Sequence, residues 1–445
     1  MRSDSVVGQI NRSSDAKANR KRVLMLTHRV PYPLDSGVRI RAHHILEHLS
    51  QRFNVSLASV TDEPVTSQQW QVMEEMADTV AVQKITPRWG KLKGFASLAM
   101  GGPVTPAYFY RRSLAKIIAR WHRIDPFDAV FTTCTGMIDY ARVVAKQPGG
   151  RRKADTHDLT GKKLVRHVID LVDVDSAKWQ DYAQASSGPM RWVYGAEAKR
   201  IKKIESGQAD RFNAITVVSA AEAKLYRNHV GDHPGLTVLR HAVDTSYFQP
   251  LPDSDNQTLL FVGVLDYKPN EDGITWFVNE VMPKLRAKNP NVTLNIVGRR
   301  PTAQVGALGM HPGVNMIGPV DDVRQYMEQA TAVIAPLRIA RGVQTKVLEA
   351  MASGRVAVCS PGAAEGIHAN DDEHLIVAQS PQQWVEKLNN VVTNRLLRER
   401  VSTAARQRIE KVYPWSRCLE PLESLITGEG LEERVPGLTP LPMAA

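Results

Sequence analysis

Short apolar segments alternate with amphipathic helical patterns along most of the chain. Near its start, an apolar strand at 23–27 is followed by a loop with Pro and Gly, a helical pattern at 39–52 and a second strand at 55–60. A strand, a helix and a strand in this order form the repeating unit of a parallel sheet. Further strands are predicted at 128–133, 164–172 and 214–219.

The alternation is interrupted at 246–258 by a stretch rich in Pro, Asp, Ser and Asn, which is typical of a linker between domains. It then resumes, with strands predicted at 258–265, 292–298, 314–318, 332–336, 356–360 and 374–378. Helical patterns lie near 271–288, 321–330, 343–353 and 381–411. The pattern predicts an α/β protein with two doubly wound, Rossmann-like domains that face a cleft. Ligands of such sheets bind beyond the carboxyl ends of the strands.

The predicted domain organisation follows from these patterns. We place an N-terminal Rossmann-like domain at 21–248 and a C-terminal one at 257–412. A helix at 413–430, after the bend expected at a proline, is predicted to cross back to the N-terminal domain. The polar residues 1–20 are predicted to form a disordered tail, and residues 431–445 a flexible one.

Targeting signals and cysteine usage indicate a cytoplasmic protein. Residues 1–20 contain basic residues but not the apolar core of a secretory signal. No apolar run approaches the roughly 18 residues needed to span a bilayer. The three cysteines, Cys134, Cys359 and Cys418, are odd in number and far apart, so we expect free thiols in a reducing compartment.

Positive charge is concentrated in one segment of a chain whose net charge is +11. Residues 84–124 contain nine Lys or Arg and no Asp or Glu, interleaved with aromatic residues such as Trp89, Phe95 and Trp121. Such a segment suits an anionic lipid surface, where each cation contributes about 1 kcal/mol. A nucleic acid and an ordinary solvated helix face are the alternatives. Because no nucleic-acid-binding motif accompanies the segment, we favour peripheral contact with the inner face of the cytoplasmic membrane.

A cluster of cations surrounds the predicted start of the helix at 343–353. Arg338, Arg341 and Lys346 all lie near this end, where unpaired backbone N–H groups and the helix dipole already favour an anion. We expect them to hold a diphosphate. Glu349 follows Lys346 by three residues on the same helical face, where it can accept hydrogen bonds from a ribose. The alternative is an ordinary Lys–Glu pair on a helix surface.

At this point the residues resemble a known family. "KVLEAMASGRVAV", followed by "GAAEGI", is similar to the donor-binding signature of the family-four retaining glycosyltransferases, which have the GT-B fold. "FVGVLDYKPNEDGITWFVNEVMPKL", "LNIVGRRP" and "PVDDVRQYMEQATAVIAPL" resemble the same group. "THRVPYPLDSGVRIRAHHILEHL" and "DLVDVDSAKWQDYA" resemble a narrower branch, the sugar transferases encoded beside bacterial exopolysaccharide and exosortase systems. The resemblance covers roughly residues 21 to 425.

The resemblance implies a donor site in the C-terminal domain. Lys268 and Lys346 match the basic residues that meet the diphosphate, and Glu349 matches the glutamate that binds the ribose. The family's other glutamate, which seven intervening residues separate from this one, is replaced by Arg341, and this leaves open how the hydroxyls of the donor sugar are recognised. The implied donor- or nucleotide-binding residues are Gly37, Gly263, Arg338, Arg341, Gly342, Glu349, Glu365 and Gly366.

The resemblance also implies how the reaction is catalysed. Lys268, Lys346 and Asp173 are the candidate catalytic residues, because Asp173 falls where many relatives carry a histidine. His28 and His157 are candidates on the acceptor side. In this fold the departing phosphate is usually given the acceptor's proton, so a strong protein base is dispensable. We expect no metal and no cofactor beyond the nucleotide-sugar donor.

The resulting hypothesis is a hexosyltransferase of exopolysaccharide biosynthesis that extends a lipid-linked glycan. Two alternatives remain at this point: a nucleotide-sugar 2-epimerase of the same fold, and a non-catalytic scaffold, which the loss of a glutamate at Arg341 suggests. The sequence does not contain the Gly-x-x-x-x-Gly-Lys-Ser/Thr motif, so a P-loop NTPase is unsupported.

Overall fold

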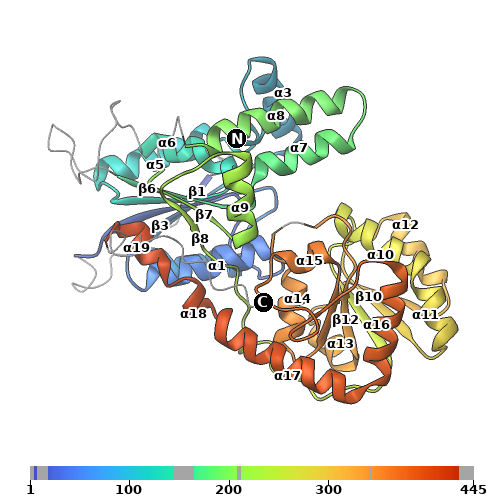
Figure 1. The fold of residues 1–445 in the computed structure, drawn as a ribbon. Coiled ribbons are helices and arrows are strands. Elements are labelled where there is room, and N and C mark those ends of the chain that lie inside the picture. The colour runs from blue at the N-terminus through green and yellow to red at the C-terminus, as the bar shows by residue number, and fades with distance from the viewer. Residues whose placement is uncertain (1–4, 8–18, 145–164, 208–211, 341, 430–445) are drawn as a thin grey trace. The chain divides into compact units, whose positions relative to one another are not determined.

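The computed structural model describes residues 5–7, 19–144, 165–207, 212–340 and 342–429 (Figure 1). The chain divides into two compact units. The N-terminal unit contains the described residues up to Val217, then Glu222–Leu239 and the residues from Leu419 onward. The C-terminal unit contains Val218–Ala221 and Arg240–Cys418. The prediction for residues 431–445 lies outside the described residues.

The N-terminal unit is built on an eight-stranded sheet with the order β1-β4-β3-β2-β5-β6-β7-β8. Every neighbouring pair is parallel except β1 with β4. The strands are β1 Ser5–Val7, β2 Arg22–Thr27, β3 Asn54–Thr61, β4 Thr79–Lys84, β5 Ala129–Thr133, β6 Arg166–Val172, β7 Ala214–Val217 and β8 Leu236–Val238. The helices are α1 Gly37–Ser50, α2 Ser67–Met76, α3 Pro87–Ala99, α4 Val104–Phe109, α5 Arg112–Ile124, α6 Ile138–Val144, α7 Asp175–Ala185, α8 Pro189–Glu205, α9 Ala220–His229 and α19 Pro421–Thr427.

The C-terminal unit is built on a fully parallel six-stranded sheet with the order β11-β10-β9-β12-β13-β14. Its strands are β9 Thr258–Val262, β10 Thr293–Val297, β11 Val314–Gly318, β12 Ala332–Ala335, β13 Val356–Cys359 and β14 Ile376–Val377. Its helices are α10 Lys268–Glu280, α11 Met282–Lys288, α12 Ala303–Gly306, α13 Arg324–Gln329, α14 Thr345–Ala352, α15 Pro361–Glu365, α16 Pro381–Thr393, α17 Arg395–Val412 and α18 Trp415–Cys418. Each unit therefore has the alternating strand and helix order of a doubly wound fold, as the sequence predicted.

Three local expectations are corrected by the structure. Residues 5–7 do not belong to a disordered tail, because they form strand β1 against β4. The single helix expected at 381–411 is two helices, because Asn394 leaves helical geometry and its side chain accepts a hydrogen bond from the backbone N–H of Leu397 at the start of α17. The helical pattern at 271–288 is likewise divided at Val281 between α10 and α11. None of the described helices combines the length and the apolar character needed to cross a bilayer.

A buried ion pair ties helix α1 to the centre of the N-terminal sheet. The guanidinium of Arg41 contacts both carboxylate oxygens of Asp170 on β6, at 2.7 and 2.9 Å. It also donates to the carbonyl of Leu239, and Thr216 on β7 donates to the same carboxylate at 2.7 Å. Both charged side chains are almost fully buried, so each depends on the other for its counter-charge.

Arg41→Ala tests this pair, because it leaves the Asp170 carboxylate buried without its cation. We expect the free energy of unfolding to fall by about 3–5 kcal/mol, measured by urea denaturation. The control is Arg52→Ala, which removes an exposed ion pair with Glu423 and should cost less than about 1 kcal/mol. Equal losses in the two variants would contradict the assignment.

Candidate active site

The strand order of the C-terminal sheet reverses between β9 and β12. In doubly wound sheets, ligands bind at such a reversal, beyond the carboxyl ends of the strands. The chain leaves β9 through Gly263 toward helix α10, and it leaves β12 through Pro336 toward helix α14. The residues of these two loops and of the following helices therefore define the candidate donor site.

Lys346, in the first turn of α14, places its ammonium group inside this site. The side chain is 9% exposed, and Nζ donates a 2.8 Å hydrogen bond to Oδ1 of Asn270 on α10. Nζ also lies 4.3 Å from the ring centre of Phe261 on β9, within the range of a cation–π contact. The amide of Asn270 is itself fixed by a 2.9 Å hydrogen bond to the carbonyl of Val264.

Glycines allow the backbone to approach this ammonium group. A Cβ added to Gly263 would lie 2.8 Å from Nδ2 of Asn270 and 3.2 Å from Nζ of Lys346. A Cβ added to Gly273 on α10 would lie 2.6 Å from the carbonyl oxygen of Pro336, at the end of β12. Both positions therefore favour Gly, because a side chain would push apart the elements that enclose the site.

Glu349 lies one helical turn after Lys346 and is half-buried. Burial raises the pKa of Glu349 to about 7, although the positive charge of Lys346 opposes this change. Burial also lowers the pKa of Lys346 to about 7, against the charge of Glu349. In the described part of the chain the two side chains form no direct ion pair. Desolvation thus outweighs their attraction, and an incoming anion would stabilise the protonated lysine.

Lys268 and Arg338 lie near the same loops but are exposed and already paired. Lys268 begins α10, and its ammonium group contacts Glu271 at 3.3 Å. Arg338 follows β12 and makes two hydrogen bonds, of 2.9 and 2.5 Å, to the carboxylate of Asp272. A diphosphate must therefore compete with these carboxylates for both cations, and it meets no such competitor at Lys346.

Two of the remaining predicted donor residues, Gly342 and Gly366, form a second tight backbone contact. Gly342 has a positive φ of 66°, and a Cβ on Gly366 would collide with its carbonyl oxygen. Glycine is therefore required at both positions for the loop before α14 to pack on the end of α15. Glu365, the last residue of α15, is exposed. Arg341 lies outside the described residues.

The N-terminal sheet has its own reversal, between β2 and β5. His28 follows β2 and Cys134 follows β5, and Nδ1 of His28 lies 3.2 Å from Sγ of Cys134. Burial lowers the pKa of His28 to about 4, with smaller contributions from the charges of Arg29 and Lys178. The imidazole is therefore neutral at pH 7 and suits hydrogen bonding to a hydroxyl better than proton donation.

Asp173 directly follows β6, the strand that pairs with β5. The last residue of β6, Val172, is strained with a φ of 67°, and so is Cys134 after β5, with a φ of 56°. Asp175, two residues further on, accepts a 3.1 Å hydrogen bond from the hydroxyl of Thr135. Burial raises the pKa of Asp175 to about 6, and the charge of Asp173 adds to this effect.

Sequence reasoning did not single out several residues that shape these sites. Asn270 and Cys134 were missed, although a buried polar residue soon after an apolar strand is a usable signal. Glu205 was missed as well; it accepts hydrogen bonds from the backbone and hydroxyl of Ser176 in α7, and burial raises its pKa to about 8. Their partners are distant in sequence, so only the fold reveals the contacts.

Two further predicted residues complete the placement of the candidates. Gly37 is the first residue of α1 and follows the N-cap residue Ser36. His157 lies outside the described residues. Among the residues that the structure describes, no three His, Cys, Asp or Glu side chains are grouped closely enough to hold a metal ion.

Comparison with protein families matches the C-terminal half. Residues 256–394 match the family described as glycosyl transferases group 1. A Klebsiella pneumoniae protein described as a 44.6 kDa protein in the cps region is 29% identical over 153 residues. This match covers 32% of the chain and 39% of that protein, so the chain spans well under two thirds of this curated relative.

Solved structures match nearly the whole chain. The sucrose-phosphate synthase of Thermosynechococcus elongatus has a TM-score of 0.66 and 13% identity, over 91% of this chain and 98% of its own. Anabaena HepE in complex with UDP has a TM-score of 0.64 and 12% identity, over 92% and 100%. WaaG, a glycosyltransferase involved in lipopolysaccharide biosynthesis, has a TM-score of 0.61 and 17% identity, over 91% and 100%.

These matches establish the fold of the chain and the family that its residues 256–394 resemble. The structural neighbours confirm the predicted GT-B fold, with its two parallel-sheet, Rossmann-like domains. The match of residues 256–394 confirms the resemblance of this segment to the group 1 glycosyltransferases. The segment that matches the family contains Lys346, Glu349 and the loop at Gly263.

The two shifted pKa values predict a stability minimum near pH 7 for the protein without ligand. The pKa of Glu349 is raised from 4.5 to about 7, so unfolding releases a proton and stability falls as the pH rises through this window. The pKa of Lys346 is lowered from 10.5 to about 7, so unfolding takes up a proton and stability rises again above pH 7. Each slope is at most about 1.4 kcal/mol per pH unit.

Urea denaturation across this pH range, compared with a Lys346→Met/Glu349→Gln double variant, measures the effect. The difference in the free energy of unfolding between the wild-type protein and the double variant should have its minimum near pH 7. As a control, Lys284→Met/Glu280→Gln removes a solvent-exposed pair and should leave the curve parallel to that of the wild type. A monotonic difference between wild type and the Lys346/Glu349 variant would refute the opposing shifts.

Proposed function

We propose that this protein transfers a sugar from a nucleoside diphosphate sugar to a polysaccharide or oligosaccharide acceptor. The observation that carries the proposal is the buried ammonium group of Lys346 at the β9/β12 reversal. It lies within the segment that matches the group 1 glycosyltransferases. A buried cation with a lowered pKa, at the ligand-binding edge of a parallel sheet, is suited to a diphosphate.

The chemistry explains why a fixed cation is needed there. When the bond between the anomeric carbon and the diphosphate breaks, negative charge grows on the leaving phosphate oxygens. A positive group already in place and shielded from water stabilises this charge without reorganising. Glu349, one turn further along α14, supplies a carboxyl that can accept hydrogen bonds from the ribose hydroxyls.

The donor and the metabolic setting are supported by the relatives. Anabaena HepE was solved with UDP, with UDP and glucose, and with UDP-glucose, and these complexes support a nucleotide-sugar donor for this chain. The cps-region relative and the lipopolysaccharide transferase WaaG support polysaccharide biosynthesis. We assign this protein to the cytoplasmic synthesis of an exopolysaccharide.

The proposed reaction retains the configuration of the anomeric carbon and uses no metal. The acceptor hydroxyl attacks from the face that the phosphate leaves, and its proton passes to a departing phosphate oxygen. Lys346 stabilises the negative charge of the leaving diphosphate, as a metal ion does in other transferases. The neutral imidazole of His28 and the carboxylate of Asp173 orient the acceptor hydroxyl, because neither has to remove the proton.

Lys346→Ala and Glu349→Ala should each weaken UDP binding by about tenfold or more without unfolding the protein. The reason is the loss of a charge-assisted hydrogen bond in one variant and of a ribose contact in the other, at about 1–3 kcal/mol each. Calorimetric titration with UDP measures the affinity, and Lys284→Ala, which removes an exposed lysine, is the control. Unchanged affinity in both site variants would disprove the donor site.

Turnover then separates the proposed function from its alternatives. Purified protein, bacterial membranes and a panel of nucleotide sugars should release nucleoside diphosphate only when an acceptor is present. Interconversion of donors without an acceptor would instead indicate a nucleotide-sugar epimerase. If UDP, GDP and ADP all fail to raise the melting temperature, a non-catalytic scaffold is the better description.

We also propose that the acceptor is lipid-linked and that helix α3 holds the protein at an anionic membrane. Four large apolar side chains of the α3 region are exposed, by 54% to 81%: Trp89, Leu92, Phe95 and Met100. Arg88, Lys91 and Lys93 are exposed on the same helix, within the acid-free segment 84–124. We call these seven residues the α3 patch. Exposed aromatic and basic side chains together match the interface of an anionic bilayer.

Charge reversal of Arg88, Lys91 and Lys93 to Glu should abolish binding to phosphatidylglycerol vesicles. Each cation contributes about 1 kcal/mol near such a surface, so affinity should fall by about 100-fold or more. Vesicle sedimentation measures it. The matched control reverses three exposed lysines elsewhere: Lys284, Lys288 and Lys411. Equal binding of both triple variants would reject the α3 patch as the membrane contact.

A further inference from the structure

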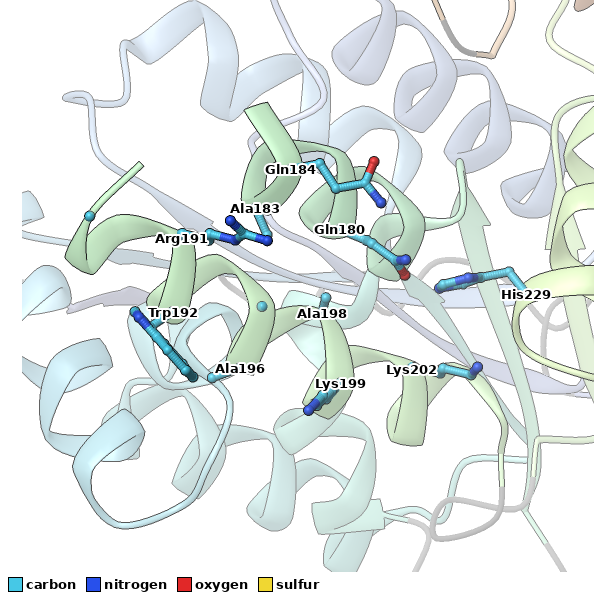
Figure 2. A pocket seen from close by; sticks show the side chains of 12 residues that line it. Gln180, Ala183, Gln184, Arg191, Trp192, Ala196, Ala198, Lys199, Lys202 and His229 are labelled. Carbon is cyan, nitrogen blue, oxygen red and sulfur yellow. The ribbon is translucent and has the colours of Figure 1, made fainter. Parts of the chain in front are cut away.

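A hollow runs along helices α7 and α8 of the N-terminal unit (Figure 2). It has a volume of about 860 Å³, which is within the range of small-molecule and oligosaccharide-sized sites. Small residues of the two helices and their turn form much of its lining: Ala183, Gly188, Gly195, Ala196 and Ala198. Because these residues lack long side chains, the space between the helices stays open. We call it the α7–α8 groove.

The charges that line the groove are all positive. Arg191, Lys199 and Lys202 of α8 are exposed and line it, and no Asp or Glu does. None of these three cations forms an ion pair with an acidic side chain in the parts of the chain that the structure describes. A ligand with several negative charges would therefore not have to displace a carboxylate of the described residues from these cations.

The uncharged lining is suited to a sugar. Trp192 is 81% exposed and offers an indole face on which the apolar C–H face of a pyranose ring can stack. Gln180 and Gln184 of α7 also line the groove, and their side-chain amides can both donate to and accept from hydroxyl groups. In Figure 2, Arg191 and Trp192 lie toward one end of the groove, and Gln180 and Lys202 toward the other.

The groove begins close to the candidate acceptor residues. Helix α7 starts at Asp175, two residues after Asp173. With a rise of 1.5 Å per residue, Gln180 lies about 7.5 Å and Gln184 about 13.5 Å beyond Asp175 along the helix axis. A chain whose reactive end lies beside Asp173 would therefore place its next sugar units along α7.

We infer that the α7–α8 groove binds an acidic segment of the acceptor polysaccharide, with uronic-acid carboxylates on its cations and a sugar ring on Trp192. This inference rests on the proposed glycosyltransferase function, since it names the chemical class of that enzyme's acceptor. A phospholipid surface fits the groove less well, because the floor is made of small residues between two helices. In the groove, Trp192 is the one exposed large apolar side chain that the lining contributes, whereas Trp89, Leu92 and Phe95 are exposed together on α3.

The test is direct binding of a tetragalacturonate, compared with neutral maltotetraose of the same length, by calorimetric titration. We expect the acidic probe to bind at least about tenfold more tightly. An Arg191→Ala/Lys199→Ala/Lys202→Ala variant should lose this binding by about tenfold or more. A control with equal charge loss outside the groove, Lys203→Ala/Lys224→Ala/Arg227→Ala, should retain it.

Trp192→Ala tests the sugar-stacking part of the inference separately from the charge of the groove. It should weaken tetragalacturonate binding at least about threefold, although it changes no charge. The inference is overturned if the two tetrasaccharides bind equally, if both triple variants lose binding equally, or if the groove variant instead loses binding to phosphatidylglycerol vesicles. UDP affinity, measured on the same samples, separates the two proposals. If the wild-type protein does not bind UDP, the proposed donor site fails; the groove variants should keep the UDP affinity of the wild type, so tetragalacturonate binding tests the groove by itself.

Discussion

An ammonium group held out of water without a direct ion pair is the constraint around which the candidate donor site is built. Lys346 is held by Asn270 and Phe261 and by the loop at Gly263, while Glu349 influences it only through space. Such a group destabilises the protein that contains it, because desolvation disfavours its charge. The same property makes the position favourable for a diphosphate, which restores the missing counter-charge. The arrangement therefore lowers the stability of the protein without a ligand and raises its affinity for an anion.

The two sheets carry chemically different groups at the points where their strand order reverses. In the C-terminal unit, glycines bring the backbone close to a cation at the reversal of strand order. In the N-terminal unit, the reversal carries a neutral imidazole at His28, and strained residues at Cys134 and Val172. A neutral hydrogen-bonding group suits a hydroxyl acceptor, and a cation suits a phosphate leaving group. The chemical difference between the two ends of the sheets thus matches the two substrates of the proposed reaction.

Much of the fold was predictable because it is encoded locally. Alternating apolar strands and amphipathic helices repeat with regular spacing, and most strands lie within a few residues of their predicted bounds. The α16–α17 division was missed, because one capping residue, Asn394, overrides a helical pattern that continues across it. Strand β8, only three residues long, carries too short an apolar run to be recognised.

The candidate site was predictable only in part. The spacing of Lys346 and Glu349 places them on one helical face, and the structure has them there. By contrast, the partner of Arg338 is Asp272, and the partner of Lys346 is Asn270, which lies 76 positions earlier in the chain. Pairing across such distances depends on how β9 and β12 meet in the sheet. The sequence indicates which side chains could bind a diphosphate. It does not indicate which of those side chains are already paired with a carboxylate in the folded protein.

Burial divides the positive charges of this protein into two kinds with different physical behaviour. Lys346 is shielded from solvent, so dissolved salt screens its charge little, and in the proposed reaction it acts on the leaving diphosphate alone. The cations of the α3 patch and of the α7–α8 groove are exposed, so each contributes little individually and salt weakens their interactions. Exposed cations act collectively, by concentrating extended anionic partners at a surface. The proposed large anionic partners therefore account for the net charge of +11 better than the proposed catalytic step, in which the buried Lys346 is the central cation.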